Sequence, residues 1–439
     1  MTTPLVRPRF LRWSVVAFVL LLPFVVLEAW DYMETRRLAA SIAKIRERHE
    51  PVITLDIQPF VIPHGESADA ARYYRAASML VGMEWDEEQR TRLPARVTDA
   101  MWSDAWPDDL MADLRARVRR ENEAMNLLDR AAPLAFEGFG SGYYARFALG
   151  DLMMLMRVAP LRTRLQALDG DGNAASRSLV AELRLQRVLG FSSGPTILGV
   201  TTAGLADTLR LIVNRSRPDA DALSKLAAAL REMDRDDRLK MYLLRSRASI
   251  LDTGTYQGIE LLNAGRVQSL SGSAALLRPW MMARLNERIE TLNALIGNAA
   301  RPWPERMEPP RSAYVCDSPR WGSSRLVDAN VMAGVATDLA LIRCARLVVA
   351  VEQYRLAHGQ ALPARIEDIV PAQLDALPID PFSGKPLRFV AEDHGYLAYS
   401  FGRNLRDDGG QLPVRSTFSM PTPGTPTPAN DLGIRIAHR

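Results

Sequence analysis

Apolar residues follow one another without a charge from Trp13 to Leu27, and no run of comparable length occurs later in the chain. With its flanking residues, this stretch is about long enough to cross a hydrocarbon core of roughly 30 Å as a helix. Tryptophans favour the two lipid–water interfaces, and Trp13 and Trp30 mark its two ends. The pattern predicts a cytoplasmic start and a transmembrane anchor over residues 1–30, with the rest of the chain on one side.

A cleaved signal peptide is the alternative interpretation of this stretch, because basic residues precede it. The apolar core, however, runs into residues 27–31, LEAWD, without a small-residue cleavage site. Arg7, Arg9 and Arg12 lie directly before the run, and the first basic residue after it is Arg36. The positive-inside rule then predicts a single-pass protein of the inner membrane with its bulk in the periplasm.

Beyond the anchor, apolar residues recur three and four positions apart, as in amphipathic helices. Residues 31–50 continue the register of the anchor and predict a helical stalk. Within a helical domain over residues 51–300, the predicted helices are Ala70–Met83, Pro107–Ala132, Tyr143–Leu168, Ala174–Leu189, Pro195–Val213, Asp219–Met233, Asp236–Leu262 and Leu276–Asn298. Short turns marked by Gly, Pro and Asp separate most of them, which favours stacked antiparallel hairpins.

The helical pattern ends at residues 301–327, a linker rich in proline and tryptophan. Residues 328–412 then combine a largely buried helix, stopped by Gly359, with two short strands at Pro386–Val390 and Tyr396–Phe401. Residues 413–439 form a predicted Pro-rich tail, because residues 421–428 read PTPGTPTP. The expected fold class is mainly α, with a small C-terminal α+β module and one transmembrane helix.

Composition narrows the classes of function. The formal net charge is +4, but only four of the 55 basic residues are lysine, and arginines alternate with acidic residues. This pattern is typical of solvated helix faces and argues against a nucleic-acid partner. The five histidines lack zinc-site spacing. Cys316 and Cys344 would meet oxidising conditions in the periplasm, so a disulfide is one interpretation, and a buried Cys344 with a free Cys316 is the other.

Two short motifs suggest chemistry that their context does not favour. Residues 190–194, GFSSG, fit the nucleophile elbow of hydrolases, but Ser192 follows a helical pattern, whereas the elbow requires a strand. Residues 169–173, DGDGN, begin like a calcium loop, yet Ala174 and Val180 stand where that loop needs glycine and a bidentate acid. A turn between helices, with Asn173 capping the second helix, explains this segment better.

The C-terminal module carries an ordered set of pieces that resembles a known family. In order, these are residues 351–355 (VEQYR), 358–359 (HG), 362–363 (LP), 380–387 (DPFSGKPL) and 399–402 (YSFG). Together they resemble the globular part of the G-type pseudopilins of type II secretion systems, over about a sixth of the chain. The helical middle resembles uncharacterised helical regions of membrane-anchored bacterial proteins.

The resemblance implies a calcium site, because in that family the loop after the last such strand binds this ion. Asn404, Asp407 and Asp408 fall where its ligands would be, and they supply the hard oxygen donors that calcium prefers. A solvated turn before the tail is the alternative interpretation of the two aspartates. The chain also departs from the family, because its anchor lies about three hundred residues before the module and carries no prepilin cleavage site.

We therefore expect a non-enzymatic envelope protein, tethered by one helix, that presents a helical protein-binding domain and a pseudopilin-like module, with a protein partner in the cell envelope. One alternative is a component associated with type II secretion or pilus-like machinery. The other is an envelope hydrolase with dispersed catalytic residues, for which Ser192 and the pair Asp393–His394 are the candidates.

Overall fold

The computed structural model describes residues 8–53, 56, 70–81, 96–97, 100, 106–134, 143–192, 195–263, 272–307, 324–412 and 431–438. These residues form mainly helices and one small antiparallel sheet, which confirms the predicted class. Contacts divide the chain into two units, and the division falls inside helix α11, between Tyr242 and Leu243. Each unit has its own core.

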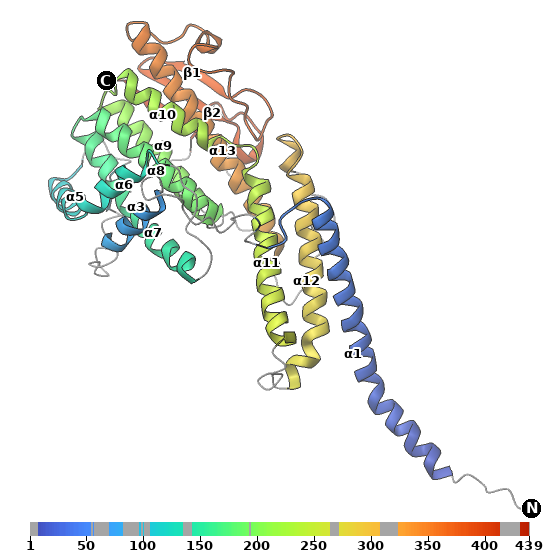
Figure 1. Cartoon of the computed structure of the whole chain (residues 1–439). Helices are drawn as coiled ribbons and strands as arrows, with labels where there is room; N and C mark the ends of the chain where they lie inside the picture. The colour runs from blue at the N-terminus through green and yellow to red at the C-terminus, as the bar shows by residue number, and fades with distance from the viewer. Residues whose placement is uncertain are drawn as a thin grey trace, which may run out of the picture. The chain divides into compact units, whose positions relative to one another are not determined.

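Unit 1 contains three long helices: α1 (Pro8–Glu47), α12 (Gly272–Asn298) and, from Leu243 onward, α11 (Arg238–Asn263). Figure 1 shows the second half of α1 alongside α12 and α11. Their apolar faces meet in a cluster formed by Leu38, Ile45, Leu251 and Ile289. The predicted stalk is therefore packed against two later helices, because the apolar stripe of residues 38–45 needs a partner to be buried.

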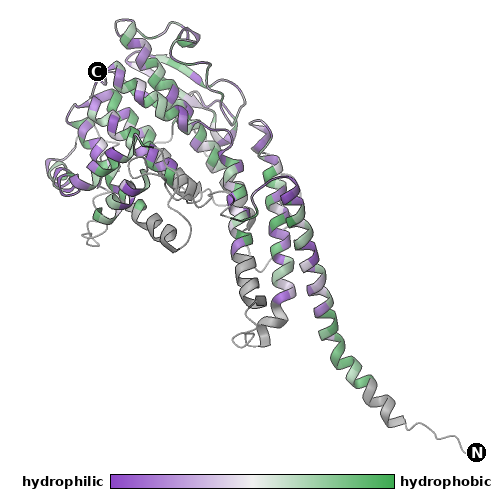
Figure 2. Cartoon of the chain, in the orientation of Figure 1, coloured by the Kyte–Doolittle hydropathy of each residue, from purple (hydrophilic) through white to green (hydrophobic). Residues whose placement is uncertain are grey.

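The first half of α1 is different. From Val15 to Val26 its large apolar side chains are 44–66% exposed, and Figure 2 shows this part of the helix as continuously hydrophobic. Among the described residues, α1 is the one helix that is long and apolar enough to cross a membrane. Exposed apolar surface of this extent on a helix is unfavourable in water and favourable in lipid.

Unit 2 is a stack of helices that ends in the sheet. Its helices are α3 (Ala70–Val81), α5 (Asp108–Arg120), α6 (Asn122–Ala131), α7 (Tyr143–Leu168), α8 (Gly172–Ser192), α9 (Pro195–Arg215), α10 (Ala220–Met233) and α13 (Ser324–Ala357). α7 and α8 pack together, α8 contacts α9 and α10, and α9 and α10 pack on α13. These helices pack on one another in the order given, and α7 has the bounds that its pattern predicts.

The sheet has the order β1 (Arg388–Glu392), β2 (Gly395–Ser400) and β3 (Leu432–Ala437), and all its pairs are antiparallel. α13 covers one of its faces, so that Val348 and Val351 share a core with Tyr396, Ile434 and Ile436. α13 itself is buried on nearly every side from Leu339 to Val351, since α9 and α10 cover the side away from the strands.

Several predicted boundaries differ from the structure. β3 lies inside the range predicted as a Pro-rich tail, where only residues 431–438 are described. The predicted helix Pro107–Ala132 is two helices that meet at Glu121, a position that neither glycine nor proline marks. The two units also divide the chain elsewhere than the predicted domains do, because α12 packs on α1 and α13 packs on α9 and α10.

The linker after α12 is described as far as the short 3₁₀ turn η1 (Glu305–Met307). Trp303 is half-buried against Ala336, Ala340 and Phe382. Cys316 lies outside the described residues, whereas Cys344 is free and buried on α13. Burial raises the pKa of the Cys344 thiol far above its usual value, so this thiol is unreactive.

Candidate functional site

The loop that follows β2 holds the three predicted metal ligands and folds back over the outer face of the sheet. It begins with the 3₁₀ turn η4 (Gly402–Asn404), and Gly409 and Gly410 have φ of 71° and 79°. A Cβ atom on Gly410 would lie 2.3 Å from Leu397 Cδ2. Only glycine fits this approach, so the loop also seals the second face of β2, which is buried along its whole length.

The structure brings Asn404, Asp407 and Asp408 together in this loop. The Asn404 side-chain amide donates to Asp408 Oδ2 at 2.6 Å, and the Asn404 Oδ1 atom accepts from the Arg406 amide at 3.1 Å. Asp407 Oδ1 accepts from the Tyr399 hydroxyl at 3.0 Å and from the Gly409 amide at 3.1 Å. The loop is therefore shaped by its own side chains, and Asp407 in particular acts as an anchor to β2.

A fourth residue, Asp431, joins this group from the start of β3. It is fully buried, and its carboxylate accepts from the amides of Gly410 at 2.7 Å and Asp408 at 3.4 Å. Burial is the main cause that raises the pKa of Asp431, and the negative charges of Asp408 and Asp407 raise it further. The loop therefore concentrates three carboxylates, and the two amide donors offset only part of their repulsion.

The residues after Asp431 have the pattern of a strand, but the Pro-rich run before them led to the prediction of a tail. Leu432, Ile434 and Ile436 alternate with other residues, which is the pattern of a half-buried strand. Their side chains pack in the same core as Ala398 of β2. A strand at this place necessarily brings Asp431 back to the loop that leaves β2, because the two strands are antiparallel neighbours.

Oxygen donors of this kind suit calcium, but most are already engaged. Arg388 Nε lies 3.6 Å from Asp407 Oδ2, so both Asp407 oxygens have partners within the protein. In the part of the chain that the structure describes, no group of three or more His, Cys, Asp or Glu has the spacing of a metal site. The feature that fits a cation is the uncompensated charge of Asp408 and Asp431, which a divalent ion would neutralise.

Asp380, in the DPFSG turn, has a structural role. Its carboxylate accepts from the Phe382 amide at 3.0 Å and from the Ser400 hydroxyl at 2.6 Å. It also accepts from the Phe401 amide at 3.4 Å. One buried carboxylate thus holds the turn before β1 against the end of β2, and these donors satisfy its charge.

Among the described residues, the candidates for hydrolysis do not form a catalytic site. Ser192 is the last residue of α8, which continues past Gly190; its side chain and residues 193–194 lie outside the described part of the chain. Asp393 and His394 lie exposed in the turn between β1 and β2. A helix before Ser192, in place of a strand, is the context in which an elbow is not expected.

The DGDGN segment is the turn between α7 and α8, as expected, although the capping residue is Asp171. Asp171 Oδ1 accepts from the Ala174 amide at 2.8 Å, whereas Asn173 bonds Asp219, the N-cap of α10, through its amide at 2.7 Å. A Cβ on Gly172 would lie 2.8 Å from the backbone nitrogen of Pro218. The glycine therefore permits close packing of two turns.

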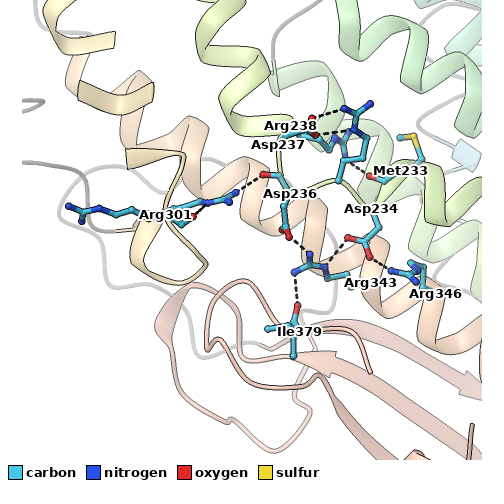
Figure 3. Close-up of polar contacts among 11 residues, drawn as sticks. Met233, Asp234, Asp236, Asp237, Arg238, Arg301, Arg343, Arg346 and Ile379 are labelled. Atoms are coloured by element: carbon cyan, nitrogen blue, oxygen red, sulfur yellow. Dashed lines mark hydrogen bonds and ion pairs between the residues drawn. The ribbon is translucent and has the colours of Figure 1, made fainter. Parts of the chain in front are cut away.

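A buried charge cluster, absent from the sequence predictions, lies where α10 ends (Figure 3). Asp234 accepts from Arg343 Nε at 2.9 Å and also from Arg346 Nη1. Arg343 further donates to Asp236 Oδ1 at 2.9 Å and to the Ile379 carbonyl at 2.7 Å. The Asp234 side chain is 6% exposed and that of Arg343 10%, so this cluster joins α10, α13 and the segment before β1 in a dry environment.

Glu182 is a second buried charge, on α8. It accepts from the Thr163 hydroxyl, and burial raises the pKa of Glu182 to about 7, against the opposing effects of Thr163, Arg164 and Arg162. A carboxyl group that titrates near neutrality is common in active sites. Glu182, however, is 3% exposed within a helix core, which points to a stability role for its proton.

A surface hollow of about 530 Å³ lies where α1 ends, lined by Arg46, His49, Glu50, Pro51, Val52, Ile53 and Asp56. Two of its acidic groups are already engaged. Glu50 accepts from the fully buried Arg247 at 2.7 Å, and Asp56 accepts from the amides of Val52 and Ile53. These contacts close the end of the three-helix unit.

The chain matches no family model, no curated protein and no solved structure.

Proposed function

We propose that this chain is a non-enzymatic protein of the cell envelope, held by α1 in the inner membrane with its bulk in the periplasm. The observation that carries the proposal is the exposed apolar half of α1, which continues without a break into the packed half. A helix that is apolar on every side for twelve residues gains free energy in lipid and loses it in water. Arg7, Arg9 and Arg12 before it favour a cytoplasmic N-terminus.

The anchor is tested by placing charge in the exposed apolar half. We expect Val19→Asp with Leu22→Asp to release the full-length protein from membranes, since a charge near the helix centre costs about 2.5–3.5 kcal/mol. The measurement is the fraction that stays in the membrane pellet after alkaline carbonate extraction. Ala39→Asp with Ala40→Asp is the matched control, because both positions are exposed in the packed half. Equal retention of both double variants would contradict the anchor.

The orientation is tested by labelling two introduced cysteines in spheroplasts with a membrane-impermeant maleimide. Lys225, on α10, has a side chain that is 60% exposed, and Lys225→Cys should react. Thr3→Cys should react only after the membrane is permeabilised. The opposite labelling pattern would place the bulk of the chain in the cytoplasm.

The stacked hairpins of unit 2 support a protein-binding role, because helix pairs of this kind present extended side-chain surfaces. Met79 and Leu80 on α3 are 58% and 39% exposed, and they are the large apolar residues that the described unit 2 helices before α7 leave open. A photo-reactive amino acid at Met79 should form a discrete adduct with one envelope protein in cells, and the same group at Lys225 should not. Identical adduct patterns at both positions would contradict a defined interface there.

Association with secretion machinery is the second candidate, and the order of α13, β1, β2 and β3 supports it only at the level of the module. α13 is already covered by the strands on one side and by α9 and α10 on the other. A helix with both faces occupied has little surface left for lateral packing into a fibre. We therefore favour a resident envelope protein over a fibre subunit.

We further propose that the loop after β2 binds calcium weakly, with Asp408, Asn404 and Asp407 supplied by the loop and Asp431 by β3. Burial, and to a lesser extent repulsion from Asp408 and Asp407, raises the pKa of Asp431, and a cation there would relieve the repulsion. Calcium that binds only the folded form stabilises it by about 2.7 kcal/mol at a hundred times the dissociation constant.

The experiment is thermal unfolding of the full-length protein in detergent, with calcium and with chelator. We expect a higher melting temperature in calcium, and Asp408→Asn should abolish the difference. Asp393→Asn is the matched control, since Asp393 is exposed in the turn between β1 and β2. Equal melting temperatures in millimolar calcium and in chelator would leave the two loop aspartates as a solvated turn.

A further inference from the structure

Beyond the apolar half of α1, most of the exposed large apolar residues described in unit 1 lie within three positions of Asp31 on α1 or Arg278 on α12, which form an ion pair. Among the described residues of this unit, those beyond Val26 are Tyr32, Met33, Ile53, Trp280 and Met281. Four of these five form what we call the collar: Tyr32 and Met33 on α1, with Trp280 and Met281 on α12. Their exposed fractions are 60%, 61%, 40% and 49%. Exposure of such a group of apolar side chains to water is unfavourable, so we expect another apolar surface to cover the collar.

Polar contacts fix the register of α12 along α1, and with it the level of the collar. Arg278 pairs with Asp31, the Asn286 amide donates to the Glu34 carbonyl at 2.8 Å, and Arg37 Nη2 lies 2.7 Å from Glu290 Oε2. Numbering thus increases in the same direction on both helices, as Figure 1 also shows. Asp31 immediately follows Trp30, the residue that ends the predicted membrane span.

The register carries the start of α12 beyond Asp31, toward the membrane. α12 begins at Gly272, six residues before Arg278. At 1.5 Å per residue, these six residues extend about 9 Å beyond Arg278, the partner of Asp31. The start of α12 is therefore level with the apolar part of α1.

We propose that the N-terminal end of α12 lies in the headgroup region of the membrane that α1 crosses, with Trp280 and Met281 in contact with lipid. The inference rests on the proposed anchoring by α1. Tryptophan and tyrosine side chains concentrate at this depth, because one end of each ring is apolar and the other is polar. The protein thus has a second membrane contact, made by a helix far from the anchor in sequence.

The charges around the collar also favour contact with lipid headgroups. The Arg284 guanidinium lies over the Trp280 ring, 5.4 Å from its centroid, and Arg36 lies over the Tyr32 ring at 5.2 Å. Each aromatic ring in the collar thus carries a cation beside it. Arginines at this level attract the phosphates of lipid headgroups, and most strongly those of anionic lipids.

The test is site-directed spin labelling of the full-length protein in vesicles of phosphatidylethanolamine and phosphatidylglycerol. Labels are attached at Trp280→Cys and Met281→Cys in a Cys316→Ser background, where the buried Cys344 thiol does not react. Relaxation by oxygen, which concentrates in lipid, is compared with relaxation by a water-soluble nickel chelate. Glu287→Cys on the same helix is the aqueous control, and Leu22→Cys is the control for the anchor.

We expect a ratio of oxygen to nickel accessibility several-fold higher at positions 280 and 281 than at 287, approaching that at 22. A high ratio at 22 with values at 280 and 281 equal to that at 287 would overturn this inference and leave the anchor intact. Protection of 280 and 281 from both reagents would also overturn it, because it indicates a protein partner on the collar. A low ratio at 22 would instead refute the proposed anchoring.

Discussion

The two units of this protein differ in the interactions that stabilise each of them internally. The largest cluster of unit 2 draws its buried residues from α7 to α10, α13, β2 and β3. In unit 1, the cluster where the three helices meet has four buried apolar residues. Polar contacts supplement it: Arg247–Glu50 is largely buried, whereas the Arg37 and Glu290 side chains are 45% and 49% exposed.

This difference follows from geometry. A stack of hairpins with a sheet at one end buries apolar side chains from several layers at once, whereas a few parallel and antiparallel helices bury one stripe each. Exposed ion pairs in water contribute 0–1 kcal/mol each, about a tenth of what burying several leucines contributes. Unit 2 should therefore carry its own stability, while unit 1 should depend on salt and on the membrane.

The largest effect we expect is from Asp234→Ala in unit 2. It leaves Arg343 and Arg346 side by side with little water, and removing one partner of a buried ion pair typically costs about 3–5 kcal/mol. Urea unfolding of the full-length protein in detergent, followed by circular dichroism, measures it. Asp236→Ala is the matched control: it removes a second partner of Arg343, but its side chain is 61% exposed and should cost less than about 1 kcal/mol. Equal losses of stability from the two substitutions would show that water reaches Asp234 as it reaches Asp236.

A cavity in the core of unit 2 should come next. Leu209 on α9 is fully buried, and Leu209→Ala should destabilise by about 2–5 kcal/mol. Hydrogen exchange should then accelerate throughout unit 2. Leu38→Ala is the counterpart in unit 1, and it should accelerate exchange only in α1, α12 and the part of α11 from Leu243 onward. Loss of protection in both units from either change would contradict their independence.

Glu182 should make the stability of unit 2 depend on pH. Its pKa is about 7 in the folded protein and about 4.5 as the ordinary value, so the folded form binds the proton more tightly. Stability is then greatest below pH 4.5 and falls by up to about 1.4 kcal/mol per pH unit as the pH rises to 7. Glu182→Gln, which resembles the protonated form, should remove this decline. Melting curves recorded from pH 5 to 8 measure this dependence. If stability falls with pH in Glu182→Gln as it does in the unchanged protein, the titrating group lies elsewhere.

The smallest effect belongs to the exposed pair of unit 1. Arg37→Ala should lower its stability by about 0.2–1 kcal/mol, and the loss should fade at high salt, because ions screen exposed charges. Hydrogen exchange of α12 peptides in low and high salt measures it. Arg48→Ala, at an exposed position just after α1, is the control. A loss comparable to that of Asp234→Ala would erase the contrast between the two units.

Much of the local structure was predictable because it depends on neighbours in sequence. The pattern of Tyr143–Leu168 predicts α7 with its actual bounds, and Gly359, with φ of 65°, stops α13 as expected. The loop with Asn404, Asp407 and Asp408 was also placed correctly after a strand. The position of Asp431 beside this loop was not predicted, because twenty-odd residues of different composition separate the two in sequence.

The sequence alone is enough to predict the helical class, the apolar first half of α1, most helix ends and the turn between β1 and β2. Each depends on side-chain periodicity or on turn residues within a few positions. Tertiary structure alone decided that α12 packs on α1, that α13 is enclosed between helices and strands, and that Asp234 meets Arg343 and Arg346. These pairings join residues from about fifty to about two hundred and fifty positions apart, and many apolar faces along the chain are chemically alike. Which face meets which is then chosen by the shape and charge complementarity of the whole chain.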